Sequence, residues 1–326
     1  MALRTRKPTG RVAYPLLLVE GPEKVGKTYA SLSLSADERI GRAFLFDFGE
    51  GSGDEYAPLG DYEIVEHNGT YSDFMSQLDA ACSEPRVDPD LPNVIVVDSI
   101  TGLWEALKVW AEKRARSSKR GRTILADDPD AEIDVSMNLW TDANDRWGRM
   151  LNRLRAWDGI AVLIARSGEV AKVGANGAPI AGQTEYRVQA QKSTPFAVSA
   201  QVRMSAPHQA TLIAARSLAV DVPEKGIALP DDAPLAHVVF EVLGAGGEWQ
   251  VSTAVHAQFG RRAVDVKREL VDAFLERGAS EGDAKQAAAA LWSSGPCAGL
   301  GRDDEVSDAD HDALLALLPE PEATDA

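Results

Sequence analysis

The sequence predicts an α/β fold in which a mainly parallel, twisted sheet is flanked by helices. Strand-like apolar runs alternate with helix-like stretches over residues 11–165, the pattern of parallel strands joined by helical crossovers. A glycine-rich turn at residues 21–28 joins the first run to its helix. Residues 93–98 form a continuous β-branched run, as expected for a strand that is covered by helices on both faces.

The expected elements follow in chain order. In the first part of the chain we expect strands at 12–20, 43–48, 62–66, 93–98 and 159–165, and helices at 27–34, 71–82, 103–116 and 137–157. Residues 167–193 are polar and predict a long loop or hairpin. Antiparallel strands are expected at 198–204 and 209–215, and a last hairpin at 237–243 and 249–252 around 244–247.

The C-terminal part differs in composition and predicts a small helical appendage. Helices are expected at 264–277, 281–292 and 307–318, the last one capped by Ser307. The predicted domains are therefore a core at 1–254 and a small acidic helical region at 255–326. This region could dock a protein partner or compete with DNA, or it could only increase solubility. Its acidic residues are Asp303, Asp304, Glu305, Asp308, Asp310, Asp312, Glu320, Glu322 and Asp325.

The bulk properties restrict the class of protein. The net charge of −16 argues against wholesale electrostatic attachment to nucleic acid. No apolar run approaches the roughly 20 residues that a membrane span needs, so no membrane partner is expected. The two cysteines, Cys82 and Cys297, suit a reducing compartment. We expect a cytoplasmic protein.

The glycine-rich turn fits the pattern G-x-x-x-x-G-K-[ST] of loops that hold nucleotide phosphates. Two glycines let the backbone curl with its N–H groups facing inward, at the start of a helix. Lys27 can reach the β- and γ-phosphates, and the Thr28 hydroxyl can ligate Mg²⁺. ATP and Mg²⁺ are therefore the expected cofactors; the alternative is a strand–helix turn without a ligand. The expected cofactor-binding residues are Gly21, Pro22, Glu23, Lys24, Val25, Gly26, Lys27, Thr28 and Tyr29.

Carboxylates are expected to complete this site. Asp98 ends the strongest buried strand, where a carboxylate can help to hold Mg²⁺. Ser99 follows it, in the place where many P-loop ATPases have a catalytic glutamate, so a water-activating carboxylate must come from elsewhere. Glu50, supported by Asp47, is the candidate because it lies just beyond a strand, at the sheet edge where ligands bind. The alternative is that Glu50 belongs to a solvated acidic loop.

At this point the chain resembles a known family. Residues 21–28, with Val-Ile-Val-Val-Asp-Ser-Ile-Thr at 94–101, resemble the RecA/RadA recombinases, and Phe-Asp-Phe-Gly-Glu-Gly at 46–51 looks like their glutamate-bearing strand end. More narrowly, roughly residues 11–220 resemble bacteriophage RecA-like ATPases that are often classed as AAA proteins, some of which anneal single-stranded DNA. One departure is the spacing, since the recombinase glutamate comes two residues after the aspartate and Glu50 comes three after Asp47.

The resemblance implies contacts with single-stranded DNA. Arg166 follows a strand at the place where the family has a polar γ-phosphate sensor. Residues 168–193 resemble the family's second DNA-binding loop; the alternative is a loop without this function. A basic cluster is a second candidate, because phosphate neutralisation is the main source of nucleic-acid affinity; the alternative is a solvated helix face. The cluster comprises Lys108, Lys113, Arg114, Arg116, Lys119, Arg120 and Arg122.

The resemblance also implies assembly, because RecA-type sites are completed at subunit interfaces. Head-to-tail contacts of that kind make rings or filaments. Arg216, after the strand at 209–215, is the expected trans-acting cation, and Arg203 is the second candidate. The expected catalytic residues are Lys27, Glu50, Asp98, Arg166 and Arg216, with Thr28 and Asp98 on Mg²⁺.

Two functions from different classes remain. The first is an ATP-hydrolysing protein that acts on single-stranded DNA in phage recombination, annealing or replication. The second is a nucleotide-gated assembly or scaffold protein with little turnover and no DNA contact. A helicase motor is a third possibility, although no accessory motor segment is recognisable. ATP turnover with and without single-stranded DNA separates the first two.

Overall fold

The computed structural model describes residues 3, 5–174, 178–244, 248–252, 261–301, 304–306 and 308–319. The chain divides into two compact units, Met1–Ala254 and Val255–Ala326. Among the described residues no helix is long and apolar enough to cross a membrane.

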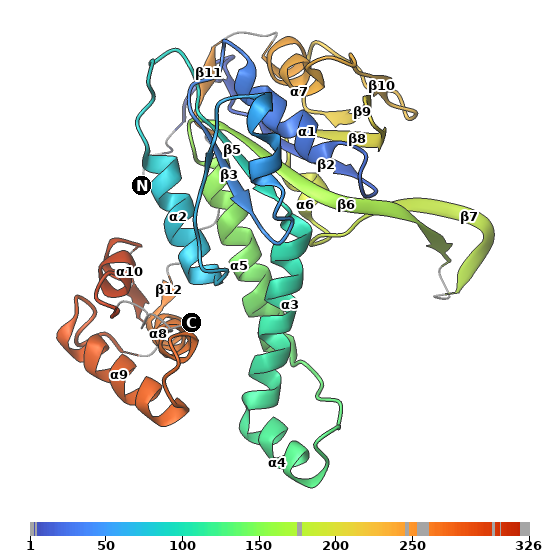
Figure 1. The fold of residues 1–326 in the computed structure, drawn as a ribbon. Helices are drawn as coiled ribbons and strands as arrows, with labels where there is room; N and C mark the ends of the chain where they lie inside the picture. The colour runs from blue at the N-terminus through green and yellow to red at the C-terminus, as the bar shows by residue number, and fades with distance from the viewer. Residues whose placement is uncertain are drawn as a thin grey trace. The chain divides into compact units, whose positions relative to one another are not determined.

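The first unit is built on a nine-stranded sheet (Figure 1). Its centre is parallel: β2 pairs with β8 and β6, and β5, β3 and β4 continue outward from β6. Antiparallel pairs extend it, with β9 on β8, β10 on β9 and β7 on β6. In spatial order the strands are β10 (Ile227–Ala228), β9 (Gln209–Ala215), β8 (Ala200–Ala206), β2 (Leu16–Gly21), β6 (Ile160–Val173), β5 (Val94–Asp98), β3 (Ala43–Asp47) and β4 (Glu63–Ile64); β7 (Pro179–Val188) pairs beside this order.

Helices cover both faces of the sheet, which explains why β2 and β5 are buried along their whole length. One face packs against α1 (Lys27–Leu32), α7 (Pro234–Ala236) and η3 (His237–Leu243). The other face packs against α2 (Tyr71–Ser83), α3 (Ile100–Ser117) and α5 (Met137–Arg155). The predicted α/β class, with a mainly parallel sheet between helices and antiparallel strands at its side, is confirmed.

Local sequence sets where the helices on the second face begin. Thr70 accepts a hydrogen bond from Asp73 N at the start of α2, and Ser99 accepts one from Gly102 N at the start of α3. These are N-cap contacts, which satisfy backbone donors that have no partner inside the helix. A further helix, α4 (Lys119–Asp127), was not predicted from the sequence, and Ser118 caps it. Figure 1 shows α4 at the far end of α3 and α5, away from the sheet.

The predicted strand at 237–243 is wrong. These residues form the π-helix η3, directly after α7. Val238, Val239, Val242 and Leu243 are buried against the sheet, and this spacing places them on one helical face. The predicted hairpin is therefore wrong too: β11 (Trp249–Gln250) pairs in parallel with β1 (Val12–Ala13) instead. Residues 245–247 of its expected turn lie outside the described residues.

Residues 167–193, expected as a loop or hairpin, form a hairpin at their start. β6 runs past the sheet edge to Val173, and β7 returns beside it in antiparallel register. Figure 1 shows the two strands as a ribbon that projects from the sheet. Most described residues of the two strands beyond Gly168 are exposed and none is buried, so the ribbon adds little to the core. The short helix α6 (Thr194–Ala197) leads back into β8.

The second unit is helical, with α8 (Ala263–Glu276), α9 (Glu281–Ser294) and α10 (Asp308–Leu315) around an apolar core. Two short strands, β12 (Arg261–Arg262) and β13 (Glu305–Val306), pair antiparallel. Ser280 caps α9 by accepting from Asp283 N. The expected cap Ser307 lies outside the described residues, as do the acidic residues Asp303, Glu320, Glu322 and Asp325.

Candidate functional site

The carboxyl ends of four parallel strands meet at one edge of the sheet. The register places Gly21 of β2 beside Arg166 of β6, and Asp98 of β5 beside Asp47 of β3. The phosphate loop leaves β2 at this edge and returns as α1. The edge of a parallel sheet formed by the carboxyl ends of its strands is where ligands bind in open α/β folds, so the predicted residues lie where such a site is expected.

The backbone of the loop depends on its two glycines. Gly26 has φ of +88°, which residues with a side chain rarely adopt. A Cβ atom on Gly21 would lie 2.2 Å from the carbonyl oxygen of Met204 in β8, so no side chain fits there. The Lys27 ammonium donates to the carbonyl oxygen of Pro22 at 2.5 Å. Lys27 thus closes across its own loop, and a phosphate held by the loop would take over this ammonium contact.

Thr28 and Asp98 form the closest side-chain contact in the site. The Thr28 hydroxyl donates to Asp98 Oδ2 at 2.5 Å. Asp98 is only 3% exposed, and this burial raises its pKa to about 6 even though the Thr28 hydrogen bond opposes the shift. Glu50 and Asp47 raise the pKa further through their charges. A buried carboxylate among other carboxylates favours a cation as its partner.

The donor set fits Mg²⁺. A hydroxyl and a carboxylate oxygen are hard ligands, and Mg²⁺ is usually bound by one or two carboxylates together with substrate phosphates. No group of three His, Cys, Asp or Glu side chains in the described part of the chain can hold a metal alone. The arrangement of Thr28 and Asp98 therefore suits an ion that arrives with a nucleotide.

Lys27 lies in the same electrostatic environment. Burial lowers the pKa of its ammonium, and the charge of Arg166 lowers it further, while Asp98 and Glu50 raise it. These influences show that Lys27, Asp98, Glu50 and Arg166 are within electrostatic reach of one another. The structure thus brings together four of the five predicted catalytic residues.

Glu50 points into this group. Its Oε1 accepts from Arg166 Nη2 at 2.8 Å and from the Ser99 hydroxyl at 3.1 Å. Asp47 holds the loop that carries it, because Asp47 Oδ1 accepts from the backbone N–H groups of Glu50 and Gly51 at 2.9 and 3.0 Å. The spacing of three residues between Asp47 and Glu50 therefore still directs the Glu50 side chain toward Asp98.

Two side chains whose contacts were not predicted from the sequence support this arrangement. Ser99, which follows Asp98 through a cis peptide bond, both caps α3 and contacts Glu50. The Thr101 hydroxyl accepts from the backbone N–H of Arg166 at 2.9 Å. The signal was the Ser-Ile-Thr sequence directly after Asp98, whose two hydroxyls face the ends of neighbouring strands.

Arg216 lies apart from this group. It follows β9, and Ala215 at the end of β9 pairs with Ala200 at the start of β8. Since Ala200 also pairs with Leu17 near the start of β2, Arg216 lies at the sheet edge opposite to the phosphate loop. Only a neighbouring subunit could bring this guanidinium to the site.

The second trans-acting candidate, Arg203, is engaged within its own chain. Its Nε donates to Glu20 Oε1 at 2.6 Å, and its guanidinium lies 4.0 Å above the Tyr186 ring. Glu20 is completely buried. Arg203 therefore neutralises a buried carboxylate next to the phosphate loop, a contact that does not favour the trans role considered for it.

The two candidate DNA surfaces lie apart from each other. The hairpin β6–β7 follows Arg166 directly, since its pairing begins at Ser167. Its four charged side chains balance: Glu169, Lys172, Glu185 and Arg187. Within it Arg187 pairs with Glu185 at 2.7 Å. The basic cluster lies on α3 and α4. It is followed by an acidic stretch, and a groove of about 150 Å³ beside α4 is lined by Arg120 as well as Glu132 and Asp134.

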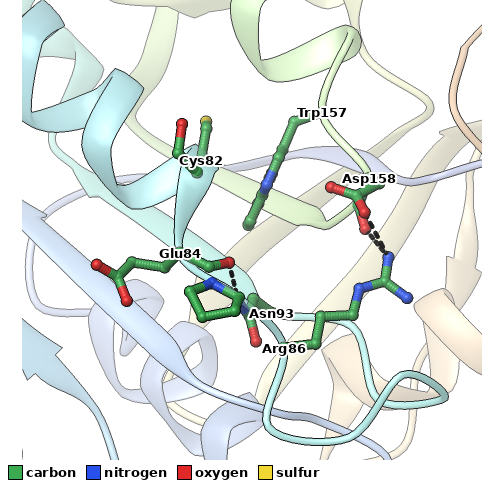
Figure 2. A pocket seen from close by; sticks show the side chains of 8 residues that line it. Cys82, Glu84, Arg86, Asn93, Trp157 and Asp158 are labelled. Atoms are coloured by element: carbon green, nitrogen blue, oxygen red, sulfur yellow. Dashed lines mark hydrogen bonds and ion pairs between the residues drawn. The ribbon is translucent and has the colours of Figure 1, made fainter.

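A separate cavity of about 240 Å³ lies at the other edge of the sheet (Figure 2). Its wall includes Asn93 before β5 and Trp157 and Asp158 before β6. Arg86 faces it but is already paired with Asp158 and donates to the Tyr14 hydroxyl at 2.8 Å. Burial raises the pKa of Cys82, another wall residue, to about 12, so its thiol is not activated. None of the predicted site residues lines this cavity.

Comparisons with known proteins identify the family of this chain. No curated protein matches the chain. A solved structure titled "Crystal structure of the RadB recombinase" aligns with a TM-score of 0.35 at 16% sequence identity, covering 63% of this chain and 83% of that one; a likeness of this strength carries no functional inference. A family model described as an AAA domain matches residues 14–204. This range is more than half of the chain and contains the phosphate loop, Asp98 and Arg166. The protein belongs to this AAA domain family.

Proposed function

We propose that the protein binds ATP with Mg²⁺ and hydrolyses it. The observation that carries this proposal is the contact of the Thr28 hydroxyl with the buried Asp98 carboxylate at 2.5 Å, beside a lysine-bearing phosphate loop. Glu50 lies across from them and can act on a water molecule. The family and the fold support a P-loop nucleotide-binding protein; the activity is our proposal.

Each side chain has a distinct role in this proposal. The loop N–H groups and the Lys27 ammonium bind the β- and γ-phosphates. Mg²⁺, held by Thr28 and Asp98, would neutralise phosphate charge. Glu50 orients the attacking water and accepts its proton. Arg166, now paired with Glu50 at 2.8 Å, can turn toward the γ-phosphate and leave Glu50 free.

The phosphate loop can be tested directly. Lys27→Ala is expected to abolish ATP hydrolysis, because the charge that stabilises the transferring phosphate is lost. Lys225→Ala is the matched control, since this lysine is exposed in the loop after β9. Retention of full activity by Lys27→Ala would sink the assignment.

We propose single-stranded DNA as the substrate on which ATP turnover acts, in phage recombination, annealing or replication. The β6–β7 hairpin supports this because it follows Arg166 directly, so a ligand on the ribbon can change the position of the sensor. Single-stranded DNA is expected to stimulate hydrolysis and to bind less tightly as salt increases. Lys172→Glu and Lys119→Glu compare the hairpin with the α4 cluster. DNA that neither binds nor stimulates would remove this half of the proposal.

One observation favours the alternative of a nucleotide-gated assembly protein. The hairpin carries equal numbers of acidic and basic side chains, namely Glu169 and Glu185 against Lys172 and Arg187. A balanced ribbon gives little phosphate neutralisation and suits contact with protein. In that case ATP would change the oligomeric state in light scattering, while single-stranded DNA would change neither turnover nor assembly.

The position of Arg216 supports a homo-oligomer with shared sites. Arg216 and Arg155 lie close enough that the charge of Arg216 lowers the pKa of Arg155, which burial already lowers. Two neighbouring guanidinium groups at one sheet edge favour an anionic partner. We propose that this partner is the nucleotide site of the next subunit in a ring or filament.

A further inference from the structure

Two exposed aromatic side chains lie beside the phosphate loop; the sequence predicts one of them, Tyr29, among the cofactor-binding residues but assigns no role to the other, His208. Tyr29 directly follows Thr28 in α1 and is 41% exposed. His208 lies in the turn between β8 and β9 and is also exposed. Their ring centroids are 5.7 Å apart and their planes meet at 75°. Single exposed aromatic residues are common, but this pair converges next to a proposed ligand.

The strand β8, which leads to the turn with His208, is packed tightly against the phosphate loop. The Met204 carbonyl oxygen lies 2.2 Å from where a Cβ on Gly21 would be, and the Met204 methyl group lies 3.8 Å from where one on Gly26 would be. His208 itself has φ of 60°, so its backbone takes a conformation in the turn that residues with a side chain rarely adopt. The aromatic pair is therefore placed by the same contacts that shape the loop.

The sheet order indicates on which side of β2 a bound nucleoside would lie. The groups proposed for the γ-phosphate and Mg²⁺, namely Asp98, Glu50 and Arg166, belong to the β6, β5 and β3 side of β2. The pair of Tyr29 and His208 lies on the opposite side, toward β8 and β9. A triphosphate with its γ end on the first side carries its sugar and base out over the second.

We propose that Tyr29 and His208 form the platform for the base of a purine nucleoside triphosphate. Tyr29 offers a ring face for stacking, and His208 forms a second wall at its edge. Stacking on an aromatic ring tolerates any base because every base has a π-face, and a purine covers more of the ring than a pyrimidine. This inference rests on the proposed nucleotide site and adds the base to it.

The test compares a ligand that has a base with one that lacks it. Calorimetry with Mg²⁺ measures ATP and inorganic tripolyphosphate on the wild-type protein, Tyr29→Ala, Tyr29→Phe and His208→Asn, in which asparagine tolerates the positive φ. Tyr29→Ala is expected to weaken ATP binding about tenfold, equal to about 1.4 kcal/mol, and to leave tripolyphosphate unchanged. Tyr29→Phe keeps the ring and is expected to bind ATP as the wild type does.

The controls separate this inference from the function on which it rests. Phe196→Ala removes an aromatic side chain that is 87% exposed near the start of β8, and no change is expected. If Tyr29→Ala weakens both ligands equally, or neither, the platform is wrong while the phosphate site stands. If the wild-type protein binds neither ligand, the nucleotide site itself is wrong and the platform falls with it. CTP binding as tight as that of ATP would overturn the preference for purines.

Discussion

At the scale of single residues, the site is a group of charges that have been taken out of water. Asp98 is nearly inaccessible, and among the described residues its carboxylate accepts a hydrogen bond from a neutral hydroxyl, that of Thr28. Burial of a carboxylate disfavours its charged form, and this is the main cause of its raised pKa. The free protein thus retains an unfavourable carboxylate that a bound cation would stabilise.

The raised pKa of Asp98 predicts how stability depends on pH. The folded pKa is about 6 and the unfolded one is about 3.9, so the folded state binds the extra proton between these values. The protonated Asp98 carboxyl therefore contributes to the free energy of unfolding below about pH 4. This contribution is lost as pH rises through about 6, a change of about 3 kcal/mol. Asp98→Asn is expected to remove this loss, and therefore to be more stable than the wild type near neutral pH.

Urea denaturation in EDTA across this pH range measures the effect. Asp54→Asn is the control, because Asp54 is exposed in η2 (Gly53–Leu59) and should not change the profile. An Asp98→Asn protein that loses as much stability as the wild type between about pH 4 and 6 would show that Asp98 titrates normally.

Glu50 gives a second prediction at this scale. Its pair with Arg166 is partly exposed on both sides, at 29% and 43%, and such pairs contribute little to stability. Glu50→Gln is therefore expected to fold and bind ATP normally, while its turnover falls about 100-fold or more because the proton acceptor is lost. Steady-state hydrolysis and ATP titration measure the two effects, with Glu55→Gln as an exposed control. Unchanged turnover would return Glu50 to the role of a solvated acid.

At the scale of elements, the hairpin is tied to the strand that feeds the phosphate loop. Tyr186 of β7 lies on the Arg203 guanidinium of β8, and Arg203 neutralises Glu20 of β2. The Glu20 carboxylate is completely buried, and its Oε2 has no hydrogen-bond partner among the described residues. These contacts connect the ribbon to the residue that precedes Gly21.

This chain of contacts predicts a large effect of Arg203 on stability. Arg203→Ala leaves a buried carboxylate without its cation and is expected to cost about 3–5 kcal/mol, measured by urea denaturation. Replacing both partners, as in Glu20→Gln with Arg203→Met, is expected to recover most of this loss. Tyr186→Ala should cost only about 1 kcal/mol, the contribution of one cation–π contact. A double variant no more stable than Arg203→Ala would mean that charge burial is not the cause.

Elements also show how far the sequence could predict the fold. The buried strands β2 and β5 were predictable because continuous apolar runs leave few alternatives. The segment His237–Leu243 was not, because its β-branched residues suit a strand, whereas the four that are buried follow helical spacing. Packing against the sheet, and not the β-propensity of its residues, made this segment helical. The position of Glu50 relative to Ser99 and Arg166 was equally hidden, since it depends on contacts between segments far apart in the chain.

At the scale of the whole molecule, the residues proposed for the site lie at both edges of the sheet. Lys27, Asp98 and Glu50 lie at the carboxyl edge of the sheet, and Arg216 lies at the opposite edge. An arginine cannot act on the phosphate loop of its own chain from there. If Arg216 is catalytic, each working site must combine the loop of one subunit with the arginine of another.

Mixing two inactive variants tests this division. Lys27→Ala lacks the loop cation but keeps Arg216, and Arg216→Ala has the reverse defect, so each alone is expected to be inactive. In a mixed assembly an Arg216→Ala subunit beside a Lys27→Ala neighbour regains both groups. Equal amounts of the two should place such a pair at about a quarter of the interfaces, and hydrolysis should recover in proportion. Full activity of Arg216→Ala alone would show that the Arg216 guanidinium is not needed. If mixing restores no hydrolysis, Arg216 of one subunit does not act on the loop of another, and the shared site is wrong.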